Sequence, residues 1–123
     1  MSCKGIGNDI LEIARLKKAI QEHGQPFLDR ILTKAEQDYC QKQADPNPRY
    51  AGRFAAKEAI VKALGCGFGS KARWLDIEIL ASDEGKPIVS FSDELAERFQ
   101  NPTIHLSISH SHNYATAVAI WTS

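Results

Sequence analysis

The fold of this chain depends most on residues 53–63, which read Arg-Phe-Ala-Ala-Lys-Glu-Ala-Ile-Val-Lys-Ala. With its flanks, this stretch predicts the longest helix, from about Pro48 to Leu64. The glycines after Leu64 end the helix, because glycine accepts the left-handed conformation found at helix C-termini. One stripe of the helix consists of small residues, namely Gly52, Ala55, Ala56, Ala59 and Ala63. Small side chains let a helix backbone pack closely on a sheet, so we expect this helix to be central in the fold.

The N-terminal segment predicts a strand and a helix. Residues 6–13 indicate a short strand that ends around Asp9, and a helix then runs through about His23 and is closed by Gly24. The apolar side chains of the predicted helix recur at helical spacing. These residues are Ile13, Leu16 and Ile20.

A second short helix is expected before the long one. Thr33 and Glu36 form a capping box, a hydroxyl and a carboxylate three residues apart, which starts a helix running to about Gln43. Residues 45–48, Asp-Pro-Asn-Pro, then break the chain.

The second half changes to the alternating period of strands. Residues 75–79 alternate apolar and polar side chains. Residues 83–87 form a turn, residues 88–91 a returning strand, and residues 93–100 a short helix capped by Ser92 or Asp93. Further strands are expected around residues 104–108 and 114–121. Helices followed by antiparallel strands predict one α+β domain over residues 1–123, with helices packed on a small antiparallel sheet.

Composition limits the class of protein. The chain has 123 residues, 43% of them hydrophobic and 24% charged, which is typical of a globular domain that needs no disulfide or structural metal. The 3 cysteines form no paired pattern and fit a reducing compartment. There is neither an apolar signal region nor an apolar run long enough for a membrane span. We therefore expect a cytoplasmic protein without a membrane or nucleic-acid partner.

Charge is unevenly distributed along the chain, although the net charge is zero. Residues 1–73 contain 13 Lys and Arg but 8 Asp and Glu, whereas residues 74–123 contain 2 and 7. This asymmetry indicates an anionic partner near the first half. Uneven surface charge with no partner explains it equally well.

The long helix also carries the candidate chemistry. Glu58 and Lys62 are four residues apart and share one face with Phe54. Asp9 and Glu58 supply two hard oxygen ligands, and such a pair suits Mg²⁺, which is completed by water and substrate phosphates. The alternatives are a solvated helix with intrahelical ion pairs and an Asp9 side chain that caps the first helix.

Two further motifs allow two interpretations each. The glycines of the Gly65-Cys-Gly-Phe-Gly segment, with Lys71 nearby, can bring amides and positive charge to a phosphate, or can simply end the helix. His110-Ser-His112 has no third His or Cys at a ligand spacing, which argues against zinc. His110 is then either a structural histidine at a strand end or a ligand-binding residue.

Five ordered stretches give this chain a resemblance to a known family. They are residues 5–10 (Gly-Ile-Gly-Asn-Asp-Ile) with Glu12 and Arg15, residues 53–59 with 62–65, residues 76–79, residues 85–87, and residues 107–110. In order and separation they resemble the motifs of the bacterial short-chain holo-[acyl-carrier-protein] synthases of the 4′-phosphopantetheinyl transferase superfamily. The resemblance runs from Gly5 to about Trp121.

The resemblance implies a function and an assembly. It implies transfer of 4′-phosphopantetheine from coenzyme A to a serine of apo acyl carrier protein, with release of adenosine 3′,5′-bisphosphate, in support of fatty acid biosynthesis. It also implies a homotrimer with coenzyme A in clefts between subunits.

The resemblance further implies roles for individual residues. The expected metal is Mg²⁺ on Asp9 and Glu58. Asp9, Glu58 and Lys62 are the expected catalytic residues, with Glu58 as general base. The expected coenzyme A residues are His110, Lys71, Gly65, Gly85 and Pro87. The expected carrier-docking residues are Arg15, Lys18 and Phe54.

Two other functions fit the same residues. One is a non-catalytic module that binds a nucleotide or coenzyme A. The other is a metal-dependent pyrophosphohydrolase that uses water in place of a carrier serine.

Overall fold

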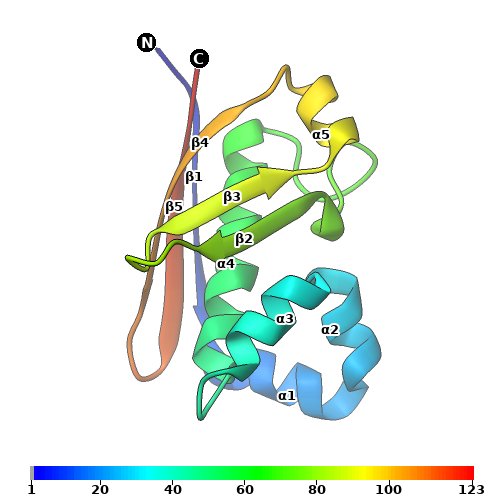
Figure 1. Cartoon of the computed structure of the whole chain (residues 1–123), viewed down its shortest axis with the longest axis vertical. Coiled ribbons are helices and arrows are strands. Elements are labelled where there is room, and N and C mark those ends of the chain that lie inside the picture. The colour runs from blue at the N-terminus through cyan, green and yellow to red at the C-terminus, as the bar shows by residue number, and fades with distance from the viewer. Residues whose placement is uncertain (1) are drawn as a thin grey trace.

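The computed structural model describes residues 2–123. Its main sheet has three antiparallel strands in the order β1-β5-β4, formed by β1 (Cys3–Glu12), β5 (Tyr114–Thr122) and β4 (Thr103–His110). Figure 1 shows both chain ends at the same end of this sheet. The predicted α+β class, with helices on a small antiparallel sheet, is confirmed.

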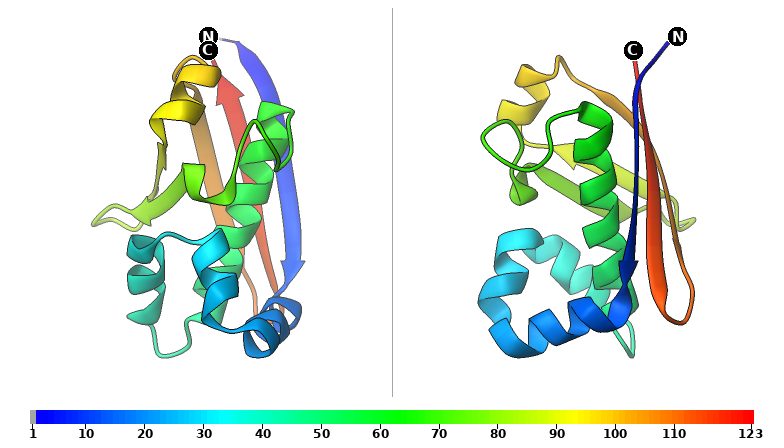
Figure 2. Two further views of the ribbon diagram at one scale, coloured as in Figure 1. Left: turned by 90° about the vertical axis from the view of Figure 1, so that its right-hand side faces the viewer. Right: turned by 180° about the vertical axis from the view of Figure 1, so that it is seen from behind.

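Helix α4 (Asn47–Leu64) is the centre of the fold, as predicted. Figure 2 shows it lying along one face of the three-stranded sheet, with the β2–β3 hairpin on its other side. The stripe of small residues on α4 faces the sheet. The β1 residues that lie against it are two glycines, Gly5 and Gly7. A Cβ atom on Gly5 would collide with the Ala63 carbonyl, and one on Gly7 with the Ala59 carbonyl. Small residues on both elements thus bring helix and strand backbones into direct contact.

The three helices that precede α4 in sequence gather at one end of the molecule (Figure 1). They are α1 (Ile13–His23), α2 (Gln25–Ile31) and α3 (Lys34–Gln41). The predicted capping box is present: the Thr33 hydroxyl accepts from the Glu36 amide, and Glu36 accepts from the Thr33 amide. The buried side chains of α1 are Ile13 and Leu16, and Ile20 is half-buried.

A second, two-stranded sheet is made by β2 (Ile77–Ala81) and β3 (Pro87–Phe91), joined by the predicted turn. The 3₁₀ helix η1 (Trp74–Asp76) precedes β2, so the strand begins two residues later than predicted. Helix α5 (Asp93–Arg98) is capped by the hydroxyl of Ser92, which accepts from the Leu95 amide.

The N-terminal segment corrects two predictions. Strand β1 continues to Glu12, so Asp9 lies within the strand, opposite Ala117, and does not cap α1. The polar side chains of Asp9 and Glu12 obscured this continuation. Helix α2 was missed because Gly24 was interpreted only as an end; Pro26, in its first turn, is a typical helix-start residue.

The face of the three-stranded sheet away from α4 carries no covering element in the described chain (Figures 1 and 2). Four of its side chains are large, apolar and exposed: Ile6, Ile10, Tyr114 and Val118. Monomeric proteins rarely expose a contiguous apolar patch of this kind.

None of the helices within residues 2–123 has the length and apolar content needed to cross a membrane.

Candidate active site

The structure brings together Asp9, Glu58 and Lys62, the three side chains predicted to carry the chemistry. Asp9 lies on the face of β1 that meets α4, while Glu58 and Lys62 are one turn apart on α4. The Lys62 ammonium lies 3.2 Å from Asp9 Oδ1 and donates to the Asn8 carbonyl at 3.0 Å. Lys62 therefore pairs with a residue 53 positions away in sequence rather than with Glu58.

The electrostatics of this cluster favour a basic carboxylate. Partial burial is the main cause that raises the pKa of Glu58, the Asp9 carboxylate raises it further, and Lys62 acts in the opposite direction. Two carboxylates near one ammonium leave an excess of negative charge and free oxygen atoms. Hard oxygen donors of this kind suit Mg²⁺. Within residues 2–123 no third His, Cys, Asp or Glu joins them, so water and substrate would complete the coordination.

Lys57, next to Glu58 in sequence, has a different environment. Its ammonium is fully buried and donates to Glu36 Oε1 at 2.7 Å, to the Ile31 carbonyl at 2.7 Å and to the Trp74 carbonyl at 3.1 Å. All three donors of the ammonium are thus used. The alternative of a solvated helix with intrahelical ion pairs is wrong, because α4 is mostly buried.

A concave pocket of about 420 Å³ lies on the side of α4 away from Glu58 and Lys62. Three of the residues predicted to bind coenzyme A line it together: Gly85, Pro87 and His110. The His110 ring is exposed and makes no hydrogen bond within the described residues, so the structural-histidine alternative has no support. Its ring nitrogens remain available for a ligand.

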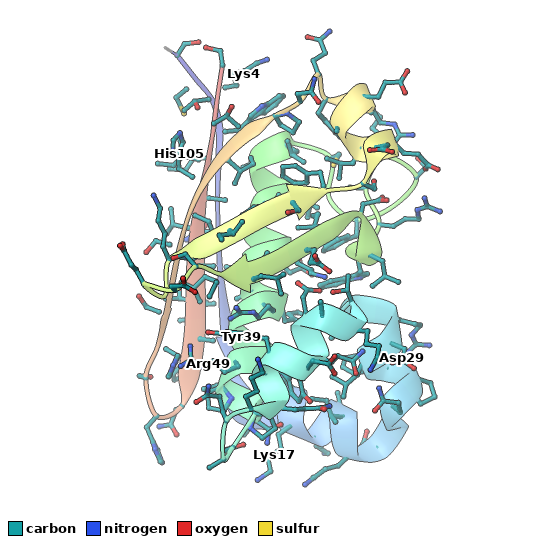
Figure 3. All side chains as sticks on the ribbon, viewed as in Figure 1. Lys4, Lys17, Asp29, Tyr39, Arg49 and His105 are labelled. Atoms are coloured by element: carbon teal, nitrogen blue, oxygen red, sulfur yellow. The ribbon has the colours of Figure 1, made fainter. Side chains whose placement is uncertain are left out.

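Two arginines that the sequence analysis did not propose also line this pocket. Arg53 is buried, donates to the Ile79 carbonyl at 3.2 Å and lies 4.5 Å from the Tyr39 ring. Arg49, 6.0 Å from the same ring, has no ion-pair partner within residues 2–123. Figure 3 shows Tyr39 and Arg49 together near the beginning of α4. The four-residue spacing of the arginines, which places both on one helix face, was the available signal.

The remaining predicted phosphate residues lie elsewhere. Gly65 ends α4 in the left-handed conformation and Lys71 is exposed on the following loop; neither lines the pocket. Gly65 lies 13 residues beyond Gly52, which is about 20 Å along the helix. In a single chain the predicted coenzyme A residues therefore form two separate groups.

The predicted docking residues are accessible. Arg15 and Lys18 are exposed on α1. Arg15 makes no ion pair in the described chain, so the alternative that it pairs with Glu12 or Glu22 is not supported. Lys18 lies 4.0 Å from Glu22. Phe54 is half-buried and packs against Trp74, with ring centroids 4.8 Å apart.

The fold and these sites define a class of protein. Glu58 and Lys62 on α4 form one cluster with Asp9 on the adjoining strand β1, and α4 borders an arginine-lined pocket on its other side. Oxygen ligands for a hard cation, together with unpaired positive charge, suit ligands that carry phosphate groups.

The comparison with known families agrees with this class. The sequence model of the 4′-phosphopantetheinyl transferase superfamily matches residues 5–119, and the chain belongs to this superfamily.

The similar proteins described next are all holo-[acyl-carrier-protein] synthases. The chain is 55% identical over 119 residues to the holo-[acyl-carrier-protein] synthase of Protochlamydia amoebophila strain UWE25, covering 97% of this chain and 98% of that protein. It is also similar to the crystal structure of Helicobacter pylori holo-[acyl-carrier-protein] synthase in complex with coenzyme A, with a TM-score of 0.87, 36% identity and coverage of 95% and 99%. The corresponding Neisseria meningitidis structure gives a TM-score of 0.91 at 30% identity, covering 99% and 100%.

Proposed function

We propose that this chain is a holo-[acyl-carrier-protein] synthase: it transfers 4′-phosphopantetheine from coenzyme A to a serine of apo acyl carrier protein. The observation that carries this proposal is the convergence of Asp9, Glu58 and Lys62 in a chain that is 55% identical to a protein of that name. The product would serve fatty acid biosynthesis in the cytoplasm, a reducing compartment that fits the free Cys3, Cys40 and Cys66.

Each residue of the cluster has a role in this reaction. The serine oxygen attacks the phosphorus nearer to pantetheine, the bond from that phosphorus to the bridging oxygen breaks, and adenosine 3′,5′-bisphosphate leaves. Glu58, one helical turn from Lys62, accepts the serine proton as the general base. Lys62 offsets the negative charge that grows on the phosphate oxygens.

Asp9 and Glu58 would also hold Mg²⁺, which supplies neutralisation and orientation of the phosphate oxygens. Removal of divalent cations with a chelator should abolish transfer, and Mg²⁺ should restore it. Asp9→Ala should remove most activity without unfolding the protein, because the Asp9 side chain is partly exposed and its ion pair is with a half-exposed lysine. Full activity in excess chelator would exclude this metal site.

The arginine-lined pocket would bind the nucleotide end of coenzyme A. Arg49, which has no ion-pair partner within residues 2–123, offers a positive charge for a phosphate, and His110, Gly85 and Pro87 line the same pocket. Lys71 and Gly65 would contact coenzyme A near the end of α4.

We further propose a homotrimer, in which the two groups of coenzyme A residues meet across neighbouring subunits. Their separation within one chain and the uncovered apolar face of the sheet support this assembly. Sedimentation should give about three times the chain mass of 13.6 kDa. Mixing inactive Asp9→Ala and His110→Ala proteins should restore part of the activity after subunit exchange, and a fully active monomer would contradict the assembly.

One experiment tests the function itself. The protein is incubated with coenzyme A, Mg²⁺ and apo carrier protein, and the carrier is weighed by mass spectrometry. We expect the carrier to gain one phosphopantetheine group as adenosine 3′,5′-bisphosphate appears. Coenzyme A binding without transfer would indicate a binding module. Pyrophosphate cleavage without any acceptor would indicate a phosphohydrolase.

A further inference from the structure

The Lys62 ammonium binds the same carboxylate that is proposed to hold the metal ion. It lies 3.2 Å from Asp9 Oδ1 and donates to the Asn8 carbonyl at 3.0 Å. Both of these acceptors belong to β1, and Lys62 makes no ion pair with Glu58 in the described chain. A positive charge of the protein itself therefore lies at a carboxylate oxygen that suits a divalent cation.

Asp9 is the fixed member of this ion pair. Its backbone carbonyl accepts a hydrogen bond of 2.8 Å from the Thr116 hydroxyl on the neighbouring strand β5. Two residues earlier in β1, a Cβ atom on Gly7 would collide with the Ala59 carbonyl of α4. These contacts hold β1 between β5 and α4, so the carboxylate of Asp9 stays in place when its partner changes.

Lys62 is the movable member. Its side chain is 50% exposed, whereas that of Asp9 is 18% exposed. A lysine carries its ammonium on a flexible four-carbon stem, and half-exposed ion pairs contribute little to stability. The ammonium can therefore leave Asp9 at small cost when another anionic group, such as a phosphate, is offered nearby.

The ammonium and a divalent cation oppose each other at Asp9. Two positive groups at one carboxylate repel, and only part of this repulsion is screened where Asp9 is mostly covered. Mg²⁺ also demands near-ideal octahedral geometry and keeps several water molecules, which need the space beside the carboxylate. A phosphate that pairs with Lys62 would remove both obstacles.

We propose that Lys62 competes with the divalent cation for Asp9, and that coenzyme A ends this competition by drawing the ammonium onto its phosphate groups. Donor and cation then bind cooperatively, and the cation is held weakly until the donor arrives. This inference rests on the proposed function, because it assumes both the metal site on Asp9 and Glu58 and coenzyme A as the donor.

The first test measures metal binding without any nucleotide. Mn²⁺ is the probe, because carboxylate oxygens suit it as they suit Mg²⁺, and electron paramagnetic resonance reports its free concentration. At constant ionic strength, Lys62→Ala should bind Mn²⁺ roughly tenfold more tightly than the wild type. Lys62→Arg keeps the charge and should bind Mn²⁺ about as weakly as the wild type. Asp9→Ala should lose the binding.

Lys34→Ala is the matched control. It also removes an exposed lysine from an aspartate partner, since Lys34 lies 3.6 Å from Asp38, and it changes the net charge by the same amount. Its affinity for Mn²⁺ should stay near the wild-type value. Equal tightening in Lys34→Ala and Lys62→Ala would show an effect of net charge and would overturn the competition.

The second test measures the coupling to coenzyme A. Calorimetry of coenzyme A binding with and without Mn²⁺ gives the factor by which the cation tightens the donor, and this factor is the same in the reverse direction. It should be larger in the wild type than in Lys62→Ala, because only the wild type has an ammonium to displace. Equal factors in both proteins would overturn the role given to coenzyme A.

The remaining outcomes separate this inference from the proposed function. If Lys62→Ala bound Mn²⁺ no more tightly than the wild type, or if Lys62→Arg bound it as tightly as Lys62→Ala, charge competition at Asp9 would be wrong although transfer could proceed. If neither wild type nor Lys62→Ala bound Mn²⁺, the proposed metal site would fail and the competition with it. If both bound Mn²⁺ as expected but the carrier gained no mass, the proposed transfer alone would fail.

Discussion

Two lysines on the same helix, Lys57 and Lys62, form ion pairs of opposite character. Lys57 and its partner Glu36 are fully buried, with 2.7 Å between nitrogen and oxygen. Lys62 and its partner Asp9 have side chains that are 50% and 18% exposed, with 3.2 Å between the charged atoms. Five residues of helix therefore separate an internal ion pair from one that faces solvent.

The difference explains why one pair stabilises the fold and the other is free for chemistry. The Lys57 ammonium donates all three of its hydrogen bonds to acceptors in α2, α3 and η1. Glu36 also accepts from the backbone amides of Thr33 and Ile79. No donor or acceptor in this network is left for a ligand. Lys62 keeps an exposed ammonium beside two carboxylates, so a phosphate can reach it without disturbing the core.

The largest expected effect comes from breaking the buried pair. Lys57→Met leaves the Glu36 carboxylate buried without its partner, which should lower the free energy of unfolding by about 3–5 kcal/mol. Urea denaturation followed by circular dichroism measures this change. Any loss of activity should follow the loss of folded protein.

The double variant Glu36→Gln with Lys57→Met sharpens this prediction. It removes both charges and keeps an amide oxygen for one of the backbone amides. It should be more stable than Lys57→Met alone, because no buried charge lacks a partner. A double variant that is less stable than the single one would show that the ion pair itself is not what Lys57→Met disrupts.

The exposed pair of Lys62 and Asp9 should matter little for stability and strongly for activity. Lys62→Ala should change the free energy of unfolding by less than about 1 kcal/mol, because half-exposed pairs contribute little to stability. It should lower kcat roughly a hundredfold, equivalent to about 3 kcal/mol, because a charge that offsets the transition state is lost. Steady-state kinetics separate the two parameters. A normal kcat with a raised KM for coenzyme A would make Lys62 a binding residue only.

A smaller effect is expected for an exposed charge that has no partner in the described chain. Arg15→Glu should raise the KM for the acidic carrier by about fivefold, since one exposed charge pair is worth up to about 1 kcal/mol. Coenzyme A binding should not change. Added salt should weaken the wild type more than the variant, because the Debye length is only about 8 Å at physiological ionic strength.

Lys34→Glu is the matched control for Arg15→Glu. It makes the same charge change on α3, at Lys34, which is exposed. The ion pair that Lys34 forms with Asp38 is exposed as well. The control should leave the carrier KM near the wild-type value. Equal effects of the two substitutions would mean that net charge, rather than α1, guides the carrier.

The smallest effect is expected for an exposed ion pair between neighbouring turns of α1. The Lys18 and Glu22 side chains are 76% and 55% exposed and 4.0 Å apart. Glu22→Gln should change the free energy of unfolding by no more than about 0.5 kcal/mol. Urea denaturation measures it, and a loss comparable to that of Lys57→Met would break the proposed relation between burial and contribution to stability.

Local signals in the sequence predicted individual elements well. The Thr33–Glu36 capping box and the helix that ends at Gly65 are both present. The sequence did not predict that Glu36 also serves Lys57, because a capping box involves neighbours and the ion pair spans 21 residues. Arg49 was missed for the same reason: its place in a pocket depends on the β2–β3 hairpin.

By itself, the sequence determined the α+β class, the central helix and the types of residue that carry the chemistry. These follow from periodicity, capping and side-chain chemistry, which act over a few residues. Only the tertiary structure decided which lysine is internal and that Asp9 reaches Lys62 from the middle of a strand. It also decided that the predicted coenzyme A residues lie in two separate groups. The physical reason is that desolvation and ion pairing depend on which distant segments pack together, and identical side chains five residues apart meet different surroundings.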